Sequence, residues 1–484
     1  MLMRLFRNKT IRWLVPCLFL LATLPPVASS AGTTRYFDKN GREITEEQYR
    51  KLTGRPPSLP PTLQSTSPSN KTDAGSEPEG GSSGGFGGTL SLVSETIIRG
   101  FERDTVDKND VRVLPVYQYL QLDYGRPEGD SFSFHFNGWG RTDLGDGDFF
   151  AEDPESALLY AFMEYVHPDA NFQTRLGRQT VFNGLISDSV DGIWLAAKPA
   201  PWIGFSAYGG LPVALKSTEG RSGDLTYGGR VFHGSDAHYE IGVSYKTVSG
   251  DQGEDEERLG GDIFLYFPGN VLLSGFSTYN LVTRGWAEHA YELSFNLSDL
   301  YIKPVYQHFN YDDFFTPGSI SSQPFRFLAQ TGETLSLTGG ELTWRRYGGL
   351  NLGAKYNHYR YTLRQESANY VAGLLDCPFG AVQTGAEIGR MDGDTPENSY
   401  LLTRAYFYWD RSSGVLRNGF FTGDVVYVAY DQDIFGKSYS FFSSLGLGRR
   451  FFEDRLEMRL SGDYSSDPFF DSDLRLMLTA LILL

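Results

Sequence analysis

The sequence predicts an all-β fold, a transmembrane antiparallel β-barrel of about 22 strands within a range of about 20 to 24. Three observations lead to this prediction. From Thr89 to Leu484, apolar and polar residues alternate with period two, the spacing of a strand with two unlike faces. The alternating stretches run for about 10 to 14 residues, close to one tilted membrane crossing. The connections between them alternate between short and long along the chain, as barrel hairpins do.

Residues 1–31 have the composition of a signal peptide. Basic residues in "MLMRLFRNKTIR" precede an apolar core, "WLVPCLFLLATL", which is too short to be a good membrane-spanning helix, and "ASSA" offers small residues for cleavage. We therefore expect export, with the mature chain starting near Gly32. Removing the four basic residues of this segment from the total of 43 leaves 39 against 59 acidic residues, a net charge of −20.

Two short segments precede the predicted barrel. Residues 32–54 predict a periplasmic turn at Asn40-Gly41 followed by a short helix, with Thr45 and Gln48 spaced as a capping box. Residues 55–88 are rich in Pro, Ser and Gly and predict a flexible linker. Because neither segment is large enough to bury a core, the barrel at residues 89–484 is the one predicted folded domain.

The long connections are expected on the outer side of the barrel and the short ones on the periplasmic side. Short turns include "KPAPW", "FPGN" and "FFEDR", and long loops include "NGLISDSVD", "SGDQGEDEER" and residues 312–333. A ring of about 22 strands encloses more space than its side chains fill, so something else occupies it. Candidates are water, an inward-folded loop such as 312–333, or another protein.

The apolar run "LRLMLTALILL" ends the sequence at Leu484 and predicts the closing strand. As a helix, its eleven residues would rise only about 16 Å, but a tilted strand of this length spans a hydrocarbon core. We expect it to pair with the first barrel strand near Leu90 to Ile98, so that no strand edge is left in lipid. A polar tail added after Leu484 should then impair assembly.

The chain resembles the outer-membrane β-barrel porins of Gram-negative bacteria. Within that class, "RLGRQTVFNGLISDSVDGIWLAA" is similar to a stretch of the alginate-export porins, with matches at Arg175, Leu176, Gly177, Arg178, Gln179, Gly184, Asp191 and Gly192. Alginate exporters are expected to have a strongly basic bore because their cargo is a polyanion. The assignable bore positions here carry mixed charge, which puts alginate in doubt as the cargo.

Alternation assigns a set of polar residues to the bore and a smaller set to loops or the rim. Arg178 falls on the lipid face unless Gly177 carries a bulge, so we expect a bulge there or a position near the rim. Arg175 and Arg178 could attract anionic or sugar substrates, or could pair with carboxylates such as Glu164 and Asp191 to brace the wall. The predicted bore residues are Arg175, Gln179, Arg230, His238, Glu240, Lys246, Glu292, Lys303, Lys355, Arg459 and Asp463, and the predicted loop or rim residues are Arg178, Asp191, Asp312 and Asp313.

The sequence gives little support to cofactor, metal or enzyme chemistry. The chain has no C-x-x-C and no C-x-x-C-H motif, and Cys377 is the one cysteine after the signal segment. The acidic loops do not match the sequence pattern of a regular calcium-binding loop. The remaining cation-binding hypothesis is that these loops share surface divalent cations with lipopolysaccharide. His308 beside Asp312 and Asp313 is the one candidate acid/base group for a barrel hydrolase, against the simpler interpretation of a solvated loop stem. We therefore expect no catalytic residues, no metal site and no cofactor.

These observations predict an outer-membrane channel for passive or weakly selective passage of small solutes. The alternative is a structural sheath around a multihaem c-type cytochrome in an extracellular electron-transfer conduit, and a barrel hydrolase is a third. Expected partners are outer-membrane lipid and lipopolysaccharide, the barrel assembly machinery and, for the alternative, the cytochrome. The negative net charge argues against nucleic acid.

Overall fold

The computed structural model divides the chain into two units, residues 1–86 and 87–484. The described residues are 36–37, 43–44, 89–103, 111–125, 131–146, 149–167, 169, 171–184, 186–213, 224–235, 238–250, 255–314, 332–345, 349–411, 417–468 and 472–484. In the first unit, β1 (Tyr36–Phe37) pairs antiparallel with β2 (Glu43–Ile44). The expected signal peptide, the Asn40-Gly41 turn, the capping-box helix and the linker lie outside the described residues.

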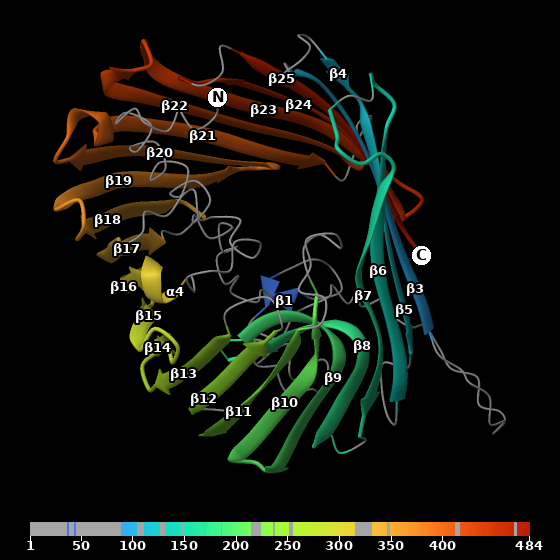
Figure 1. Cartoon of the computed structure of the whole chain (residues 1–484). Helices are drawn as coiled ribbons and strands as arrows, with labels where there is room; N and C mark the ends of the chain where they lie inside the picture. Colours follow the sequence, from blue (N-terminus) through green and yellow to red (C-terminus); the bar gives the residue numbers. More distant parts are fainter. Residues whose placement is uncertain are drawn as a thin grey trace. The chain divides into compact units, whose positions relative to one another are not determined.

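The second unit is a closed antiparallel barrel of 22 strands, β3 and β5 to β25, with one extra short strand, β4 (Figure 1). The predicted all-β class and the predicted count of about 22 are confirmed. The strands are β3 (Thr89–Arg103), β4 (Val111–Val113), β5 (Pro115–Gly125), β6 (Ser131–Asp143), β7 (Glu155–Val166), β8 (Phe172–Asn183), β9 (Ile186–Ala200), β10 (Ile203–Pro212), β11 (Leu225–Ser235), β12 (Tyr239–Ser249), β13 (Glu256–Phe267), β14 (Val271–Asn280), β15 (Gly285–Leu297), β16 (Leu300–Asn310), β17 (Thr334–Arg345), β18 (Asn351–Tyr361), β19 (Glu366–Phe379), β20 (Val382–Gly393), β21 (Tyr400–Arg411), β22 (Gly419–Ile434), β23 (Lys437–Phe451), β24 (Leu456–Ser466) and β25 (Asp473–Leu483).

The ring closes where the last strand pairs with the first. β25 runs antiparallel to β3 from the pair Leu476 and Gly100 to the pair Leu483 and Val93. Two backbone hydrogen bonds of 2.9 Å between Leu484 and Leu92 extend this seam to the final residue. The predicted closing strand is therefore confirmed, and closure satisfies the backbone groups that a free strand edge would leave unpaired.

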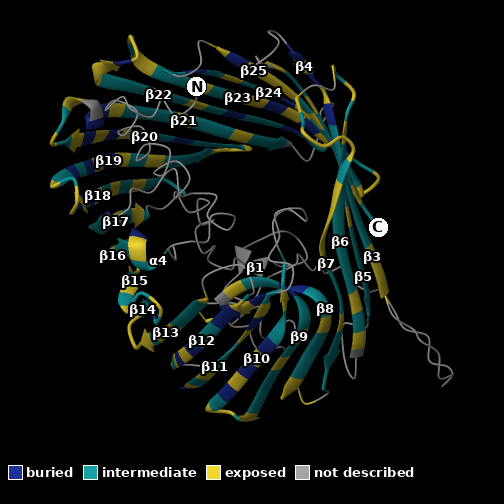
Figure 2. Cartoon of the chain, viewed as in Figure 1, coloured by how far each residue is buried: buried dark blue, intermediate teal, exposed yellow. Residues whose placement is uncertain are grey.

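The two faces of the barrel wall differ in chemistry. On β11 and β12, for example, Val231, Ile241 and Val243 are about half exposed on one face, whereas Arg230 and Lys246 alternate with them on the other. Figure 2 shows this alternation as stripes of exposed and less exposed residues along the strands. The apolar side chains form the outer face, because the β8–β9 hairpin bends inward onto the face that carries Arg230.

Helical structure is scarce among the described residues. A single turn, α4 (Tyr311–Phe314), follows β16, and a 3₁₀ turn, η2 (Pro396–Asn398), precedes β21. In the part of the chain that the structure describes, no helix has the length and apolar character needed to cross a membrane. Tyr311 is buried, and this burial raises the pKa of its hydroxyl.

Candidate functional site: the bore and its folded-in hairpin

The β8–β9 hairpin leaves the wall and enters the bore. β7 pairs with β8 only as far as Ala161 and Arg178. β10 pairs with β9 as far as Pro212 and Val190, and one further backbone hydrogen bond joins Val213 to Ser189. β8 and β9 nevertheless stay paired with each other to the tip at Asn183 and Ile186. Figure 1 shows this green hairpin curving across its neighbouring strands. The tip, residues 179–188, is therefore a two-stranded tongue that covers part of the inner wall.

A row of glycines allows the sheet to bend at this point. Gly177 pairs with Gly192, which in turn pairs with Gly210 on β10. Gly177 has φ +127°, in the region that favours glycine, and a Cβ on Gly192 would lie 2.1 Å from the carbonyl oxygen of Gly209. The strands can therefore approach closely and turn inward only where side chains are absent. Of the two expected alternatives, a bulge at Gly177 is not present, because pairing with β7 and β9 continues through it without a register shift, and Arg178 instead lies where the pairing of β8 with β7 ends.

The tongue is held against β10 and β12 by Asp188. This carboxylate accepts a hydrogen bond from the Tyr208 hydroxyl at 2.8 Å and lies 2.7 Å from the Lys246 ammonium group. Behind it, Val181, Val190 and Tyr208 form a small buried apolar cluster. Two polar contacts and a buried apolar cluster therefore hold the hairpin against the inner wall.

Gln179 and Arg178 sit at the bend. Gln179 is on the inward face, as expected, but it is only 1 % exposed and does not contact the solvent of the bore. Its amide nitrogen donates to the carbonyl oxygens of Arg175 and Gly192, both at 3.3 Å. Arg178 pairs with Asp191 at 2.7 Å and donates to the Leu158 carbonyl, a group that β8 no longer covers. The predicted pair of Arg178 and Asp191 is present at the bend.

The inner wall beside the tongue carries a second group of paired charges. Arg230 contacts Glu240 at 2.6 Å and also pairs with Asp262. The Gly184 tip of the tongue lies over this group, because a Cβ there would meet Ser244, Asp262 and Arg230 within 3 Å. Lys246 contacts Glu256 at 3.3 Å as well as Asp188. No positively charged side chain in this group lacks an opposing carboxylate.

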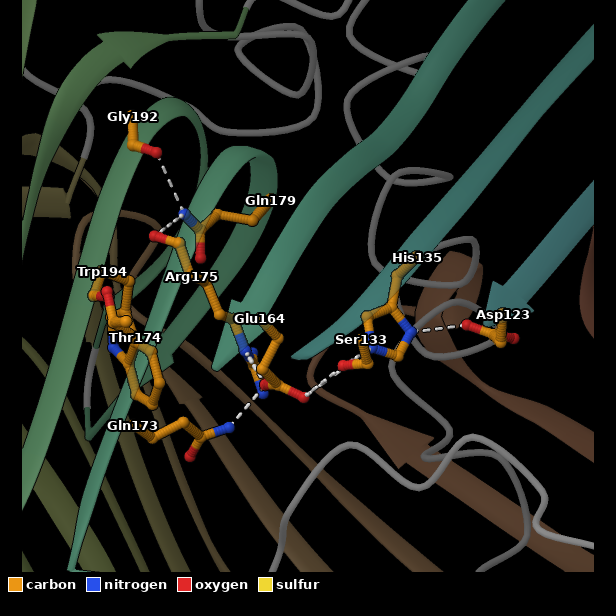
Figure 3. A network of polar contacts seen from close by, with 10 residues as sticks. All are labelled: Asp123, Ser133, His135, Glu164, Gln173, Thr174, Arg175, Gln179, Gly192 and Trp194. Carbon is orange, nitrogen blue, oxygen red and sulfur yellow. Dashed lines mark hydrogen bonds and ion pairs between the residues drawn. The ribbon is translucent and has the colours of Figure 1, made fainter. Parts of the chain in front are cut away.

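Arg175 belongs to a network centred on Glu164 (Figure 3). Glu164 accepts from Arg175 Nε at 2.6 Å and from the Gln173 amide at 2.5 Å, so the predicted pair of Arg175 and Glu164 is present. The network continues on β6, where Ser133 Oγ lies 2.9 Å from His135 Nε2. Sequence alternation alone could not reveal it, because its members come from four strands.

The same network contains a Ser-His-Asp arrangement. His135 Nδ1 lies 2.6 Å from Asp123 Oδ1, and its Nε2 faces Ser133. Glu164 also lies 3.7 Å from His135 Nε2 and accepts from Ser133 Oγ at 3.5 Å. Ser133 Oγ is therefore shared between His135 and Glu164, and Glu164 is itself bound by Arg175 and Gln173. We interpret this network as a structural link between strands β5 to β8, and not as a nucleophile with its general base.

Replacing Glu164 by alanine should lower the free energy of unfolding by about 3 kcal/mol, because Arg175 would be left half-buried without its carboxylate. Glu457→Ala is the matched control, since Arg450 would lose Glu457 but keep Asp410 at 2.9 Å. We expect the control to cost less than about 1 kcal/mol. Urea unfolding of the lipid-reconstituted barrel measures both, and equal losses for the two variants would contradict the role of the Glu164 network.

The other predicted bore residues are spread around the ring. Glu292 and Lys303 face each other at 3.8 Å, and the Lys355 ammonium lies 5.8 Å from the centre of the Tyr370 ring. Arg459 donates to Thr422 at 3.3 Å, and Asp463 lies opposite Arg475 in the pairing of β24 with β25. These residues do not form one cluster.

Two predictions at the ends of strands need correction, and a third is not tested. His238 is exposed in the turn before β12 and is not part of the wall, because β11 and β12 pair only from Ser235 and Tyr239 inward. His308 does not pair with Asp312 or Asp313. Its Nδ1 lies 2.9 Å from Ser336 Oγ, whereas Asp312 accepts from the Gly332 amide and Asp313 from the Asn310 side chain. Residues 315–331 of the proposed inward loop 312–333 lie outside the described residues.

Sequence reasoning missed several ion pairs that join different strands of the wall. Arg404 contacts Asp424 at 3.0 Å, Arg450 contacts Asp410 at 2.9 Å, and Arg141 contacts Glu155 at 2.6 Å. Each pair joins residues that are close only when the strand register is known. The signal available in the sequence is the excess of both charge types on the polar face of consecutive strands.

A closed antiparallel barrel with an apolar outer face and an ion-paired inner face has the build of a membrane-spanning β-barrel. No protein-family model and no curated protein matches the chain. Among solved structures, it is similar to OccAB4 of Acinetobacter baumannii, with 8 % identity over 82 % of this chain and 97 % of that one and a TM-score of 0.43. It is also similar to the outer membrane protein OpdK of Pseudomonas aeruginosa, with 9 % identity over 83 % of this chain and 100 % of that one and a TM-score of 0.38.

Proposed function

We propose that this chain is a channel in the outer membrane of a Gram-negative bacterium and passes small polar solutes with weak selectivity. The observation that carries the proposal is the two-faced ring: 22 strands close on themselves, with large apolar side chains exposed outside and paired charges inside. An apolar outer face suits lipid, and a polar inner face suits a water-filled path.

Weak selectivity follows from the pairing of the inner charges. Arg175, Arg230, Lys246 and Arg404 each contact at least one carboxylate. Paired charges cancel much of each other's field at a distance, so a bore of this kind lacks the strong single-sign potential that a polyanion exporter needs. Small neutral and zwitterionic solutes fit this lining better than alginate does.

The docked tongue sets the size limit in this proposal. It occupies part of the cross-section beside β10 to β13, where Asp188 and the Gly184 tip contact the wall. A solute then passes between the tongue and the remaining inner wall. Lipid, lipopolysaccharide and the barrel assembly machinery are the partners that an outer-membrane location implies, and the proposal includes no cofactor and no enzyme activity.

Solute entry into liposomes tests the proposal. Proteoliposomes containing the purified barrel should swell in a series of sugars at rates that fall as the sugars become larger. Empty liposomes and liposomes with heat-denatured protein are the controls. Correctly folded barrels, shown by heat-modifiable gel mobility, that leave liposomes as impermeable to the smallest sugar as empty ones would overturn the proposal.

A further inference from the structure

A row of polar residues crosses six strands on the outer face of the barrel. Direct pairing partners connect β14 to β19 in this row, so its members lie side by side at about 5 Å spacing between strands. They alternate with inward-facing positions such as Glu288 and Gln307 and so share the apolar side of the wall. The row consists of Ser277, His289, His308, Ser336, Arg360 and Ser367.

The row lies at the rim, next to the long connection between β16 and β17. Its members are one to four residues from the ends of their strands. A second polar row lies below it on the same face, and apolar residues follow further from the rim. The second row is Tyr291, Tyr306, Thr338, His358 and Asn369, and the lower row is Phe295, Ile302, Leu342, Ala354, Gly373 and Ile388. The two upper rows are called the rim belt below.

Hydrogen bonds within the wall hold the belt histidines in fixed orientations. His289 Nδ1 lies 2.7 Å from Ser277 Oγ, which lies 2.6 Å from the Tyr291 hydroxyl. His308 Nδ1 lies 2.9 Å from Ser336 Oγ, and the two imidazole rings are 5.7 Å apart. When the serines donate to Nδ1, each Nε2 carries a proton, and neither Nε2 has a hydrogen-bond partner among the described residues. Two neighbouring N–H donors are therefore available on the outer face.

Arg360 adds a positive charge to the same row. It is exposed, and the structure gives its guanidinium no partner within the described part of the chain. Two other outward arginines near strand ends or bends are neutralised, Arg390 by Asp431 and Arg178 by Asp191. Asp394, which accepts from Ser367, marks the end of the belt on the β20 side. The belt thus presents a cation and two donors side by side on the outer face.

Aromatic rings flank these donors. Trp286 is 52 % exposed, and its ring lies 4.9 Å from His289 and 5.2 Å from Tyr279. Tyr306 is 41 % exposed in the second row. Tyrosine and tryptophan are favoured at the level of lipid headgroups, where one side of the ring contacts acyl chains and the other contacts water.

We propose that the rim belt binds the phosphorylated sugar headgroup of an outer-leaflet glycolipid. The guanidinium of Arg360 and the Nε2–H groups of His289 and His308 are donors for phosphate oxygens, and Trp286 and Tyr306 offer faces for sugar rings. The apolar row below then contacts the acyl chains. The inference rests on the outer-membrane location in the proposed function, but it does not require the barrel to conduct.

Diphosphoryl lipid A is the probe, titrated against the purified, detergent-solubilised full chain with binding followed by native mass spectrometry. Monophosphoryl lipid A, phosphatidylglycerol and phosphatidylethanolamine are tested in parallel. The variant is His289→Gln/His308→Gln/Arg360→Gln. Arg449→Gln is the control, because Arg449 is also exposed on the outer face but lies near the other end of the wall. Heat-modifiable gel mobility shows that each variant is folded.

The native chain and Arg449→Gln should bind diphosphoryl lipid A more tightly than the monophosphoryl form and both phospholipids. The triple variant should bind it at least about tenfold more weakly, the loss expected when charge-assisted hydrogen bonds are removed. Native affinity in the triple variant, or equally tight binding of phosphatidylglycerol by the native chain, would overturn the proposal. A barrel that binds lipid A but admits no solute would refute the channel and leave the rim belt standing.

Discussion

Asp188→Ala should raise the single-channel conductance of the barrel. The substitution removes the acceptor of Tyr208 and one of the two carboxylates beside Lys246, which together hold the tongue against β10 and β12. Losing these contacts should cost about 1 to 3 kcal/mol of docking free energy. The population with the tongue undocked would then rise by roughly 5- to 150-fold. Currents through single barrels in planar bilayers should show larger and more variable open levels.

Asp424→Ala is the matched control for this effect. This substitution also removes one aspartate from the inner face and leaves a basic residue, Arg404, without that partner. Asp424 lies on β22, away from the tongue. Both variants change the charge of the bore equally, so a general electrostatic effect would appear in both. If Asp424→Ala changes the open levels as much as Asp188→Ala does, the tongue is not what limits the current.

Leu478→Arg should destabilise the barrel by about 2 to 4 kcal/mol, the cost of an arginine that faces lipid near mid-depth. Leu478 lies in the middle of β25 on the outer face and pairs with Ile98 across the seam. Leu481→Arg is the control, because Leu481 is on the inner face of the same strand and lies opposite Glu95. There the new charge gains an opposing carboxylate, so we expect little change in stability.

Urea titration of both variants folded into lipid vesicles measures this difference, with heat-modifiable gel mobility as the readout of folded barrel. A loss confined to Leu478→Arg supports the assignment of the two faces at the seam. Equal destabilisation by the two substitutions, or a larger loss with Leu481→Arg, would show that the assignment of lipid and bore faces is wrong.

Period-two alternation was sufficient to predict the barrel, because it repeats in every strand and depends only on local sequence. The closing strand could be predicted for the same reason, since the run ending at Leu484 has an apolar face and the length of one crossing. Two ion pairs could also be predicted, because each joins strands that follow one another in the chain. Arg175 on β8 pairs with Glu164 on β7, and Arg178 on β8 pairs with Asp191 on β9.

The tongue could not be predicted from local pattern. Residues 172–200 alternate like any other hairpin, and the bend depends on Gly177, Gly192 and Gly210 lying side by side on three strands. Their alignment is a property of register, which alternation does not specify. The wrong position predicted for His238 has a related cause. The alternation of polar and apolar residues continues to His238, whereas the pairing of β11 with β12 ends at Ser235 and Tyr239.

The measurement that tests the central claim most directly is the current through the purified, haem-free native chain in planar lipid bilayers. A channel with a bore of its own should insert in discrete steps of equal conductance with no other protein added. Folded barrels that insert but carry no current alone, and that purify from cells as a red complex with a multihaem cytochrome, would contradict the channel and support the sheath instead.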